Sequence, residues 1–307
     1  MKILITGASG MVGSNIVEHP SAAQHQLLTP NSNALNLLSE GAVLAYMQEH
    51  QPELVIHCAG TVGGIQANIA APVKFFSDNM LMSLNVISGA REVGVQRLLN
   101  LGSSCMYPRT AVNPLKEDLV LTGELEPTNE GYALAKIAAA RLCDYITQEQ
   151  PELSYKTLIP CNLYGRYDKF GADNSHMIPA VIAKISDARY HQTPSVEIWG
   201  DGKARREFMY AGDFADFIYF VIDQIDSLPN LVNVGLGKDH TINEYYQTIA
   251  AVLGYDGEFV HDLTKPVGMQ QKLVDTARLH TLGWAPHTSL AEGIKHTYQF
   301  YMDGKNA

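Results

Sequence analysis

The chain has 307 residues, 46% of them hydrophobic and 18% charged, so it can bury a large core. Its formal net charge of −10 argues against nucleic acid and anionic membranes as partners. No apolar run approaches the ~18 residues of a membrane span, and the apolar start breaks at glycines, so we expect no signal peptide. The four cysteines show no C-x-x-C spacing, and we expect reduced thiols in a cytoplasmic protein without a metal site.

The N-terminus carries the pattern of a dinucleotide site. Residues 2–6 form a short apolar run that predicts a strand, and Gly7, Gly10 and Gly13 follow it at the start of a helical stretch. In this context Gly7 permits a tight turn, Gly10 lets the backbone approach a pyrophosphate, and Gly13 permits close packing of helix on sheet. The loop therefore predicts cofactor binding.

The end of the second predicted strand, residues 25–29, bears on the choice of cofactor. An acid at this point would bind the ribose hydroxyls of NAD, whereas an arginine would accommodate a 2′-phosphate. The chain has neither there. The missing acid favours NADP(H), with Ser9, Asn31 and Ser32 as neutral donors to the phosphate.

The next elements complete an alternation of strands and helices. Residues 54–58 and 95–101 read as buried strands, and residues 72–94 between them as a long helix. The small residues 59–64 suit close passage of a cofactor, and His57 is expected to be packed in the core. This alternation predicts an α/β fold with a doubly wound parallel sheet of Rossmann type.

A candidate catalytic group follows the strand that ends at Leu101. The segment LGSSCMYP delivers Ser103 and Cys105 beyond the carboxyl end of that strand, where ligands bind in open α/β sheets. Tyr132 and Lys136 then lie one helical turn apart on one face of a predicted helix. A nearby ammonium stabilises a phenolate, which gives the tyrosine a physical reason to need the lysine.

The remainder of the chain is less regular. Residues 155–159 predict a further strand, and His176 follows in a polar loop where a histidine is usually just solvated. Trp199 and Arg206 belong to a segment with an aromatic ring and three cations, 198–208. Such a cluster can hold a phosphate and stack a base, or it can be a surface hairpin.

These patterns predict two domains. Residues 1–164, with part of 195–222, are expected to form the NADP-binding Rossmann domain. Residues 165–194 and 223–307 are expected to form a smaller substrate-binding domain.

The order of motifs resembles the GDP-L-fucose synthase family, whose members are bifunctional epimerase–reductases among the extended short-chain dehydrogenases/reductases. The motifs are GMVGS, LNLL, LGSSCMYP, LEPTNEGYALAKIA, NLYG, NSHMIPA, REF, VGLG and RLHTLGW. Related epimerases have no thiol at the place of Cys105, and dehydratases carry an acidic pair where this chain has Ser104 and Cys105. The resemblance therefore depends most on Cys105 and His176.

The resemblance implies a reaction and a role for each catalytic residue. The substrate would be GDP-4-keto-6-deoxy-D-mannose, which is epimerised at C3 and C5 and reduced by NADPH at C4 to GDP-L-fucose. Cys105 and His176 would move protons during epimerisation. Ser103 and Tyr132 would bind the C4 oxygen, Tyr132 would protonate it, and Lys136 would bind the nicotinamide ribose.

The resemblance also implies the binding residues and a homodimer, with the helices 72–94 and 132–148 as candidates for the interface. The substrate-binding residues implied are Lys184, Trp199, Arg206 and Lys272. The cofactor-binding residues implied are Gly7, Ser9, Gly10, Met11, Val12, Gly13, Asn31, Ser32, Leu101, Gly102, Ser103, Ser104, Lys136, Asn162, Leu163, Tyr164, Gly165 and His176.

Three departures from the family pattern leave alternatives open. Ser9 and Ser32 stand where typical members carry arginine, which weakens selectivity for NADPH. Val267 replaces an acid and Gln271 an arginine on the substrate side, which leaves room for GDP-L-colitose synthase, an enzyme that inverts only C5 of a 3-deoxy sugar. A non-catalytic dinucleotide-binding protein on this fold is a further alternative, but such proteins typically lose the tyrosine or lysine that this chain retains.

Overall fold

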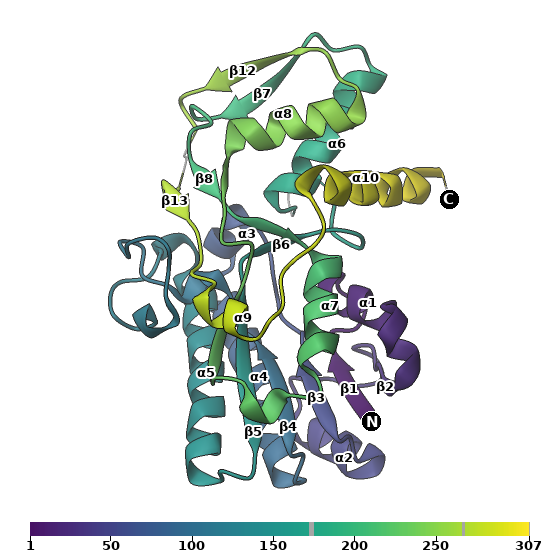
Figure 1. Cartoon of the computed structure of the whole chain (residues 1–307), viewed down its shortest axis with the longest axis vertical. Helices are drawn as coiled ribbons and strands as arrows, with labels where there is room; N and C mark the ends of the chain where they lie inside the picture. The colour runs from purple at the N-terminus through teal and green to yellow at the C-terminus, as the bar shows by residue number, and fades with distance from the viewer. Residues whose placement is uncertain (172–174, 266–267, 307) are drawn as a thin grey trace.

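The structure is a computed structural model, and it describes residues 1–171, 175–265 and 268–306. Figure 1 shows a large α/β unit in the lower part of the molecule and a smaller unit above it. The strands of the large sheet are β1 (Lys2–Thr6), β2 (Gln26–Leu28), β3 (Leu54–His57), β4 (Arg97–Leu101), β5 (Ser154–Pro160) and β10 (Leu231–Val234). Its helices are α1 (Met11–Val17), α2 (Glu40–His50), α3 (Ile65–Ala70), α4 (Pro72–Glu92), α5 (Glu130–Glu149), α7 (Ala211–Val221) and α9 (Ala277–Thr281).

The six strands lie in the order β10-β5-β4-β3-β1-β2, and every neighbouring pair is parallel. The chain runs outward from β1 to β2, then crosses back to β3 on the other side of β1. The sheet is thus doubly wound, which confirms the predicted fold class. Its topological switch point lies beside β1, where open α/β sheets bind ligands at the carboxyl ends of their strands.

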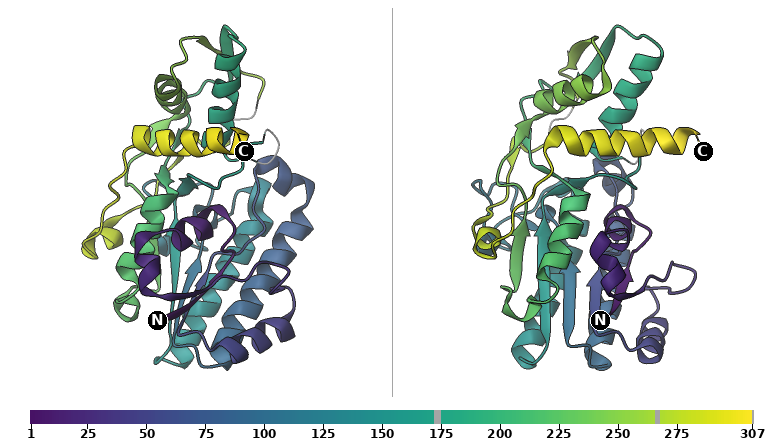
Figure 2. Two further views of the ribbon diagram at one scale, coloured as in Figure 1. Left: turned by 90° about the vertical axis from the view of Figure 1, so that its right-hand side faces the viewer. Right: turned by 45° about the vertical axis from the view of Figure 1, so that its right-hand side comes forward.

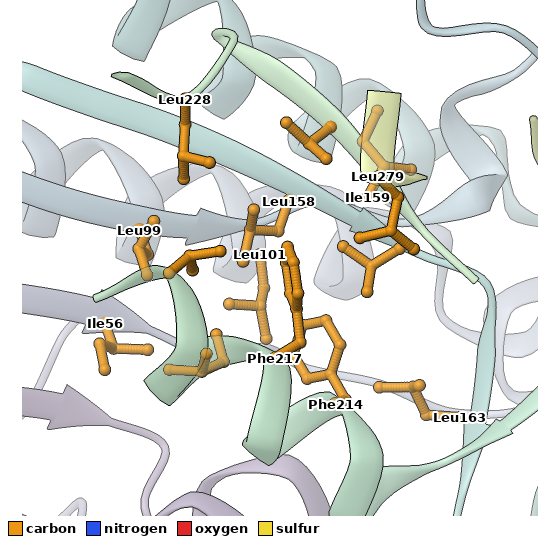
Figure 3. Close-up of a cluster of buried hydrophobic side chains, with 14 of the residues drawn as sticks. Ile56, Leu99, Leu101, Leu158, Ile159, Leu163, Phe214, Phe217, Leu228 and Leu279 are labelled. Atoms are coloured by element: carbon orange, nitrogen blue, oxygen red, sulfur yellow. The ribbon is translucent and has the colours of Figure 1, made fainter. Parts of the chain in front are cut away.

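Alternate side chains of the buried strands pack on opposite faces of the sheet. Leu98 of β4 belongs to a core with helices α2, α4 and α5, whereas Leu99 and Leu101 belong to a core with α1, α7 and α9. Figure 2 shows the two helical layers on opposite sides of the sheet. In Figure 3, Phe214 and Phe217 of α7 point into the second core. Each such buried aromatic side chain contributes about 1.5–3 kcal/mol to folding.

The predicted domain boundary differs from the structure at β10. Residues 223–307 were expected in the smaller domain, but Leu231–Val234 pairs with β5 at the edge of the large sheet. This strand is only four residues long, and the irregular sequence around it hides the pattern. The division of cofactor and substrate binding between two domains stays a prediction.

The smaller unit has a core of its own, separate from the two cores of the large sheet. Its fully buried members include Ile182, Ile185, Tyr245 and Ile249. Helix α8 (Ile242–Leu253) begins with a capping box formed by its N-cap threonine and the glutamate three residues later, and it ends at a glycine with a φ of 66°. The elements of the smaller unit are β6 (Asn162–Tyr164), α6 (Met177–Tyr190), β7 (Ser195–Trp199), β8 (Arg205–Arg206), β9 (Phe208–Tyr210), β11 (His240–Thr241), α8 (Ile242–Leu253), β12 (Glu258–Asp262), β13 (Gln271–Lys272) and α10 (Leu290–Asn306).

Strands of the smaller unit pair in short ladders. β7 pairs with β12, β6 pairs with β9, and β8 lies between β11 and β13. Within the described ranges, no helix is long and apolar enough to cross a membrane.

Candidate active site

A cavity of about 580 Å³ opens at the carboxyl ends of β1, β3 and β4, beside the switch point of the sheet. Its volume falls within the ~300–1,000 Å³ typical of pockets for small molecules and cofactors. All five predicted catalytic residues line it: Ser103, Cys105, Tyr132, Lys136 and His176. So do most of the predicted cofactor residues: Gly7, Ser9, Gly10, Met11, Val12, Gly13, Asn31, Ser32, Leu101, Gly102, Ser103, Ser104, Lys136, Asn162, Leu163 and His176.

The glycine-rich loop is shaped by close backbone contacts. Gly7 has a φ of +70°, and a Cβ on it would lie 2.7 Å from the Cα of Ala59. A Cβ on Gly13 would lie 2.3 Å from the carbonyl oxygen of Gly7. Larger residues at either position would push the loop off the sheet. The loop therefore presents backbone rather than side chains to the cavity, as a dinucleotide phosphate requires.

The cavity wall near the end of β2 carries neutral polar groups. Ser9, Asn31 and Ser32 line it, and among the described lining residues there is no arginine. The Oδ1 atom of Asn31 accepts hydrogen bonds of 3.0 Å from the backbone N–H groups of Asn33 and Ala34. That oxygen is therefore used within its own turn, and only the amide NH₂ of Asn31 is left to meet a ligand.

His57 is a core histidine, as the sequence predicts. It is fully buried, its Nδ1 lies 2.8 Å from the Oγ1 of Thr6, and its Nε2 lies 3.3 Å from the Oγ of Ser83. Burial, with a smaller contribution from the charge of Lys136, lowers the pKa of His57 to about 3. The ring is therefore neutral at physiological pH and joins two strands to α4.

Lys136 reaches the cavity from α5 and is itself almost fully buried. Its Nζ donates a 2.9 Å hydrogen bond to the carbonyl oxygen of Leu101, at the end of β4. The same Nζ lies 5.9 Å from the centre of the Tyr132 ring. Burial lowers the pKa of Lys136 to about 8, and the charge of Cys58 opposes this shift. A largely desolvated ammonium group thus stands beside the phenol.

The pKa of Tyr132 is raised, which differs from the expected stabilisation of its phenolate. Burial is the main cause, the charge of Cys105 adds to it, and a hydrogen bond with Ser103 acts in the opposite direction. The ammonium of Lys136 is engaged by the Leu101 carbonyl and does not outweigh the loss of water. In this site the phenol therefore keeps its proton and is prepared to donate it.

The thiol of Cys105 receives two hydrogen-bond donors. Asn129 donates through Nδ2 to the sulfur at 3.1 Å, and the Nζ of Lys272 lies 3.6 Å from it. The backbone N–H of Cys105 donates to the Oγ of Ser103 at 3.2 Å, within a short turn that follows β4. The sequence identifies the thiol but not its two donors.

His176 lies at the N-cap of α6 and is exposed where it borders the cavity. It also faces Asp168: burial raises the pKa of that carboxyl group, and the charge of His176 opposes the rise. Two groups capable of proton transfer, Cys105 and His176, thus border one cavity, which fits the prediction that they work as a pair.

Two predicted cofactor residues are not among the described residues that line the cavity. Tyr164 is buried in the core of the smaller unit, and its hydroxyl donates to the carbonyl oxygen of Leu290. Gly165 packs against Ala211 at the start of α7. In the NLYG motif, only Asn162 and Leu163 border the cavity, because the chain turns away after them into the smaller unit.

The four predicted substrate residues also lie outside the described lining of the cavity, in two groups. Lys184 and Trp199 both bond to Glu197, the first to its carbonyl oxygen and the second to its carboxylate at 3.1 Å. Arg206 of β8 and Lys272 of β13 are opposite one another in register. Of these four residues, Lys272 is the one whose side chain contacts a predicted catalytic residue, the thiol of Cys105.

Asn129 is a polar residue of this cavity that the sequence analysis does not single out. It occupies the N-cap position of α5, yet its side chain makes no capping hydrogen bond and turns to the Cys105 sulfur instead. Its Oδ1 is buried and has no hydrogen-bond partner within the described ranges. An asparagine three residues before the tyrosine reads as an ordinary helix start, so the pattern gave no signal.

Comparisons with known proteins agree with this geometry. The model of the NAD dependent epimerase/dehydratase family matches residues 3–235. The chain is 54% identical to the GDP-L-colitose synthase of Yersinia pseudotuberculosis over 306 residues, 100% of this chain and 99% of that protein. It is 48% identical to the GDP-L-fucose synthase of Azorhizobium caulinodans over 303 residues, 99% of this chain and 97% of that protein.

A solved structure extends the agreement to three dimensions. A GDP-mannoheptose C4 reductase from Campylobacter jejuni with NADP bound is 30% identical and superimposes with a TM-score of 0.88 over 98% of each chain. The family match extends from β1 to β10, the two ends of the large sheet in chain order, and includes every described residue that lines the cavity. This chain therefore belongs to the NAD dependent epimerase/dehydratase family, among the extended short-chain dehydrogenases/reductases.

Proposed function

We propose that the protein is an NADPH-dependent epimerase–reductase of GDP-4-keto-6-deoxy sugars, which converts GDP-4-keto-6-deoxy-D-mannose to GDP-L-fucose. The observation that carries this proposal is that one cavity holds Cys105 and His176 together with Ser103, Tyr132 and Lys136. The first pair serves proton transfer at carbon, and the other three serve reduction of a ketone. Relatives named for this chemistry at 48% and 54% identity support it.

Epimerisation begins at the carbon atoms beside the C4 ketone, whose carbonyl group acidifies the neighbouring C–H bonds. The Cys105 sulfur takes a proton from one face, and the electron pair moves to the C4 oxygen as an enolate. Ser103 and Tyr132 donate hydrogen bonds to that oxygen while its charge develops. His176 returns a proton from the opposite face, which inverts the centre.

Reduction uses the proton that Tyr132 retains. NADPH, when bound, supplies a hydride to C4. The Tyr132 hydroxyl then gives its proton to the C4 oxygen, and Lys136 beside it stabilises the phenolate that forms. Burial raises the pKa of Tyr132, so the phenol holds its proton until the C4 oxygen needs it.

The chain's own residues suit the cofactor and the nucleotide. The backbone of the glycine-rich loop would hold the pyrophosphate, Ser9 and Ser32 the adenosine phosphate, and Lys136 the nicotinamide ribose. Lys184, Trp199 and Arg206 would hold the GDP moiety, since two cations and an exposed indole ring match a diphosphate and a base.

A homodimer remains part of the proposal. Several apolar side chains of the neighbouring helices α4 and α5 are exposed, among them Val73, Leu84, Leu134 and Tyr145. Two copies of this helix pair packed together would cover them. The expected interface is therefore the face formed by α4 and α5.

GDP-L-colitose synthesis is the second candidate, favoured by the higher identity to the synthase named for it. The Gln271 amide donates to Asp239 at 2.6 Å, so it is held within the protein where the family pattern has an arginine for the substrate side. Val267, the other departure, lies outside the described residues. Both candidates use the same base, acid and hydride step, and they differ in the substituent at C3.

The experiment that tests the function is incubation of the purified protein with NADPH and each GDP-4-keto sugar in turn, with products identified by NMR. Formation of GDP-L-fucose from the 3-hydroxy substrate supports the proposal. Turnover of the 3-deoxy substrate alone would establish the colitose reaction instead. Reduction without inversion at C5 would reject the epimerase in both cases.

A further inference from the structure

A lysine from the far end of the chain meets the thiol of Cys105. Lys272 lies 167 positions later in the sequence, and its Nζ is 3.6 Å from the sulfur. We propose that Lys272 is a positioning residue that keeps Cys105 in its thiolate form, ready to accept the substrate's proton. This inference rests on the proposed function, and it gives Lys272 a different role from the substrate contact expected from the sequence.

The hydrogen bonds around the sulfur favour the charged form. The Asn129 amide donates to it at 3.1 Å, and the Lys272 ammonium approaches it as a second donor. A thiolate accepts both, whereas a thiol must place a hydrogen of its own among them. An opposite charge within ~4–6 Å of an ionisable group also stabilises its charged form.

The backbone around Lys272 is fixed on both sides, so the contact with the thiol is built into the fold. On one side β13 pairs in parallel with β8, with Lys272 opposite Arg206. On the other side the N–H of Leu273 donates to the Oδ1 of Asn113 at 2.8 Å, and the carbonyl oxygen of Leu273 accepts from Leu115 at 2.8 Å. Val274, which follows, is buried, and its backbone N–H donates a hydrogen bond to the carboxylate of Glu207.

The other titratable groups that border this part of the cavity do not replace the lysine. Tyr132 of α5 faces the thiol but keeps its proton, so it brings no positive charge. The Lys136 ammonium is bound to the Leu101 carbonyl, and His176 borders the cavity from the start of α6. Among the described residues, Lys272 is the cation with a contact to the sulfur.

The test is alkylation of the resting protein by iodoacetamide, without cofactor or substrate, followed at Cys105 by peptide mass spectrometry from pH 5 to 10. Only the thiolate reacts, so the rate against pH reports its population. Cys58 is an internal control, because burial raises its pKa to about 12 and it should react slowly throughout. The variants are Lys272→Met, Lys272→Arg and, as a charge-matched control on an exposed loop, Lys238→Met.

In Lys272→Met we expect the midpoint of the alkylation curve to rise by about one pH unit, with roughly tenfold slower labelling at pH 7. Lys272→Arg should restore most of the labelling, and Lys238→Met should match the wild type. If Lys272→Met does not fold, Lys272→Gln keeps a donor without the charge and should show the same rise. An unchanged midpoint in a folded, uncharged variant overturns the inference.

The alkylation test and the test of the proposed function have independent outcomes. Alkylation needs neither NADPH nor a sugar, so it reports on Lys272 even if the protein proves to act on another substrate. A wild type that labels readily at pH 7 but does not exchange substrate protons would reject the epimerase while leaving the role of Lys272 intact.

Discussion

A thiolate at Cys105 opposes ionisation of Tyr132, because the two side chains border the same cavity. The base proposed for epimerisation therefore helps the acid proposed for reduction to keep its proton. Once Cys105 has taken a proton from the substrate, its charge is gone and that restraint on Tyr132 is relaxed. This arrangement would favour proton transfer at carbon before reduction at C4.

The first prediction concerns the acid of the reduction step. Tyr132→Phe removes the hydroxyl while keeping the ring, so reduction should fall by roughly two to four orders of magnitude. The measurement is NADPH oxidation at saturating substrate, and the variant should still bind NADPH with near wild-type affinity. Reduction at close to the wild-type rate would remove Tyr132 from the mechanism.

The second prediction concerns cofactor choice. NADPH should be preferred over NADH, but by less than in relatives with an arginine clamp, since neutral donors such as Ser9 and Ser32 gain less from a phosphate than a guanidinium does. The ratio of kcat/KM for the two cofactors measures this, and Ser32→Arg should increase it. A clear preference for NADH would contradict the assignment.

The third prediction concerns acid stability. The pKa of His57 is about 3 in the folded protein against 6.5 in the unfolded chain, so unfolding takes up a proton between these values. Stability from this group is present above pH 6.5 and is lost as the pH falls, by up to roughly 5 kcal/mol. Unfolding free energies from urea melts at pH 4.5 to 7 measure the slope.

His57→Gln serves as the matched variant, because an amide can bond Thr6 and Ser83 without titrating. Its stability should depend less on pH over this window. Glu207 acts in the opposite direction, because burial raises its pKa from 4.5 to about 7. The stability that comes from this group is present below pH 4.5 and is lost as the pH rises to about 7. The difference between variant and wild type removes this common contribution, and equal slopes would show that His57 is not the group responsible.

Local patterns in the sequence predicted the parts of the site that depend on neighbouring residues. Gly13 lies against the backbone of Gly7, and Gly7 lies against the backbone that follows the neighbouring strand, so neither position has room for a side chain. Tyr132 and Lys136 share a face because they are one turn apart on the same helix. Each feature belongs to one strand–loop–helix unit. Pattern and spacing suffice at this scale, and the structure places all of these residues at one cavity.

Contacts between residues that are far apart in the sequence could not be predicted from local patterns. The contact of Lys272 with Cys105 needs the ladder between β13 and β8, which are too short to give a pattern. Tyr164 was assigned to the cofactor from its motif, but the core of the smaller unit buries it. The raised pKa of Tyr132 follows from burial, which spacing along a helix does not reveal.

The fourth prediction separates the two half-reactions. Cys105→Ser replaces the thiol by a hydroxyl that is too weakly acidic to act as a base near neutral pH. The variant should bind NADPH and substrate, exchange protons slowly, and accumulate product that has not been inverted. His176→Asn should bind substrate but fail to complete inversion, since the donor on the opposite face is missing.

The most direct measurement is deuterium uptake by the substrate in D₂O without cofactor turnover, followed by mass spectrometry. Wild-type protein and a Cys143→Ser control, whose thiol is buried in the core and is not among the described residues that line the cavity, should incorporate deuterium beside the C4 ketone. Cys105→Ser should incorporate it at least a hundredfold more slowly, the lower end of general base catalysis (~10²–10⁴). If Cys105→Ser exchanges and inverts the substrate as fast as the wild type, Cys105 is not the base and the central claim of this mechanism is wrong.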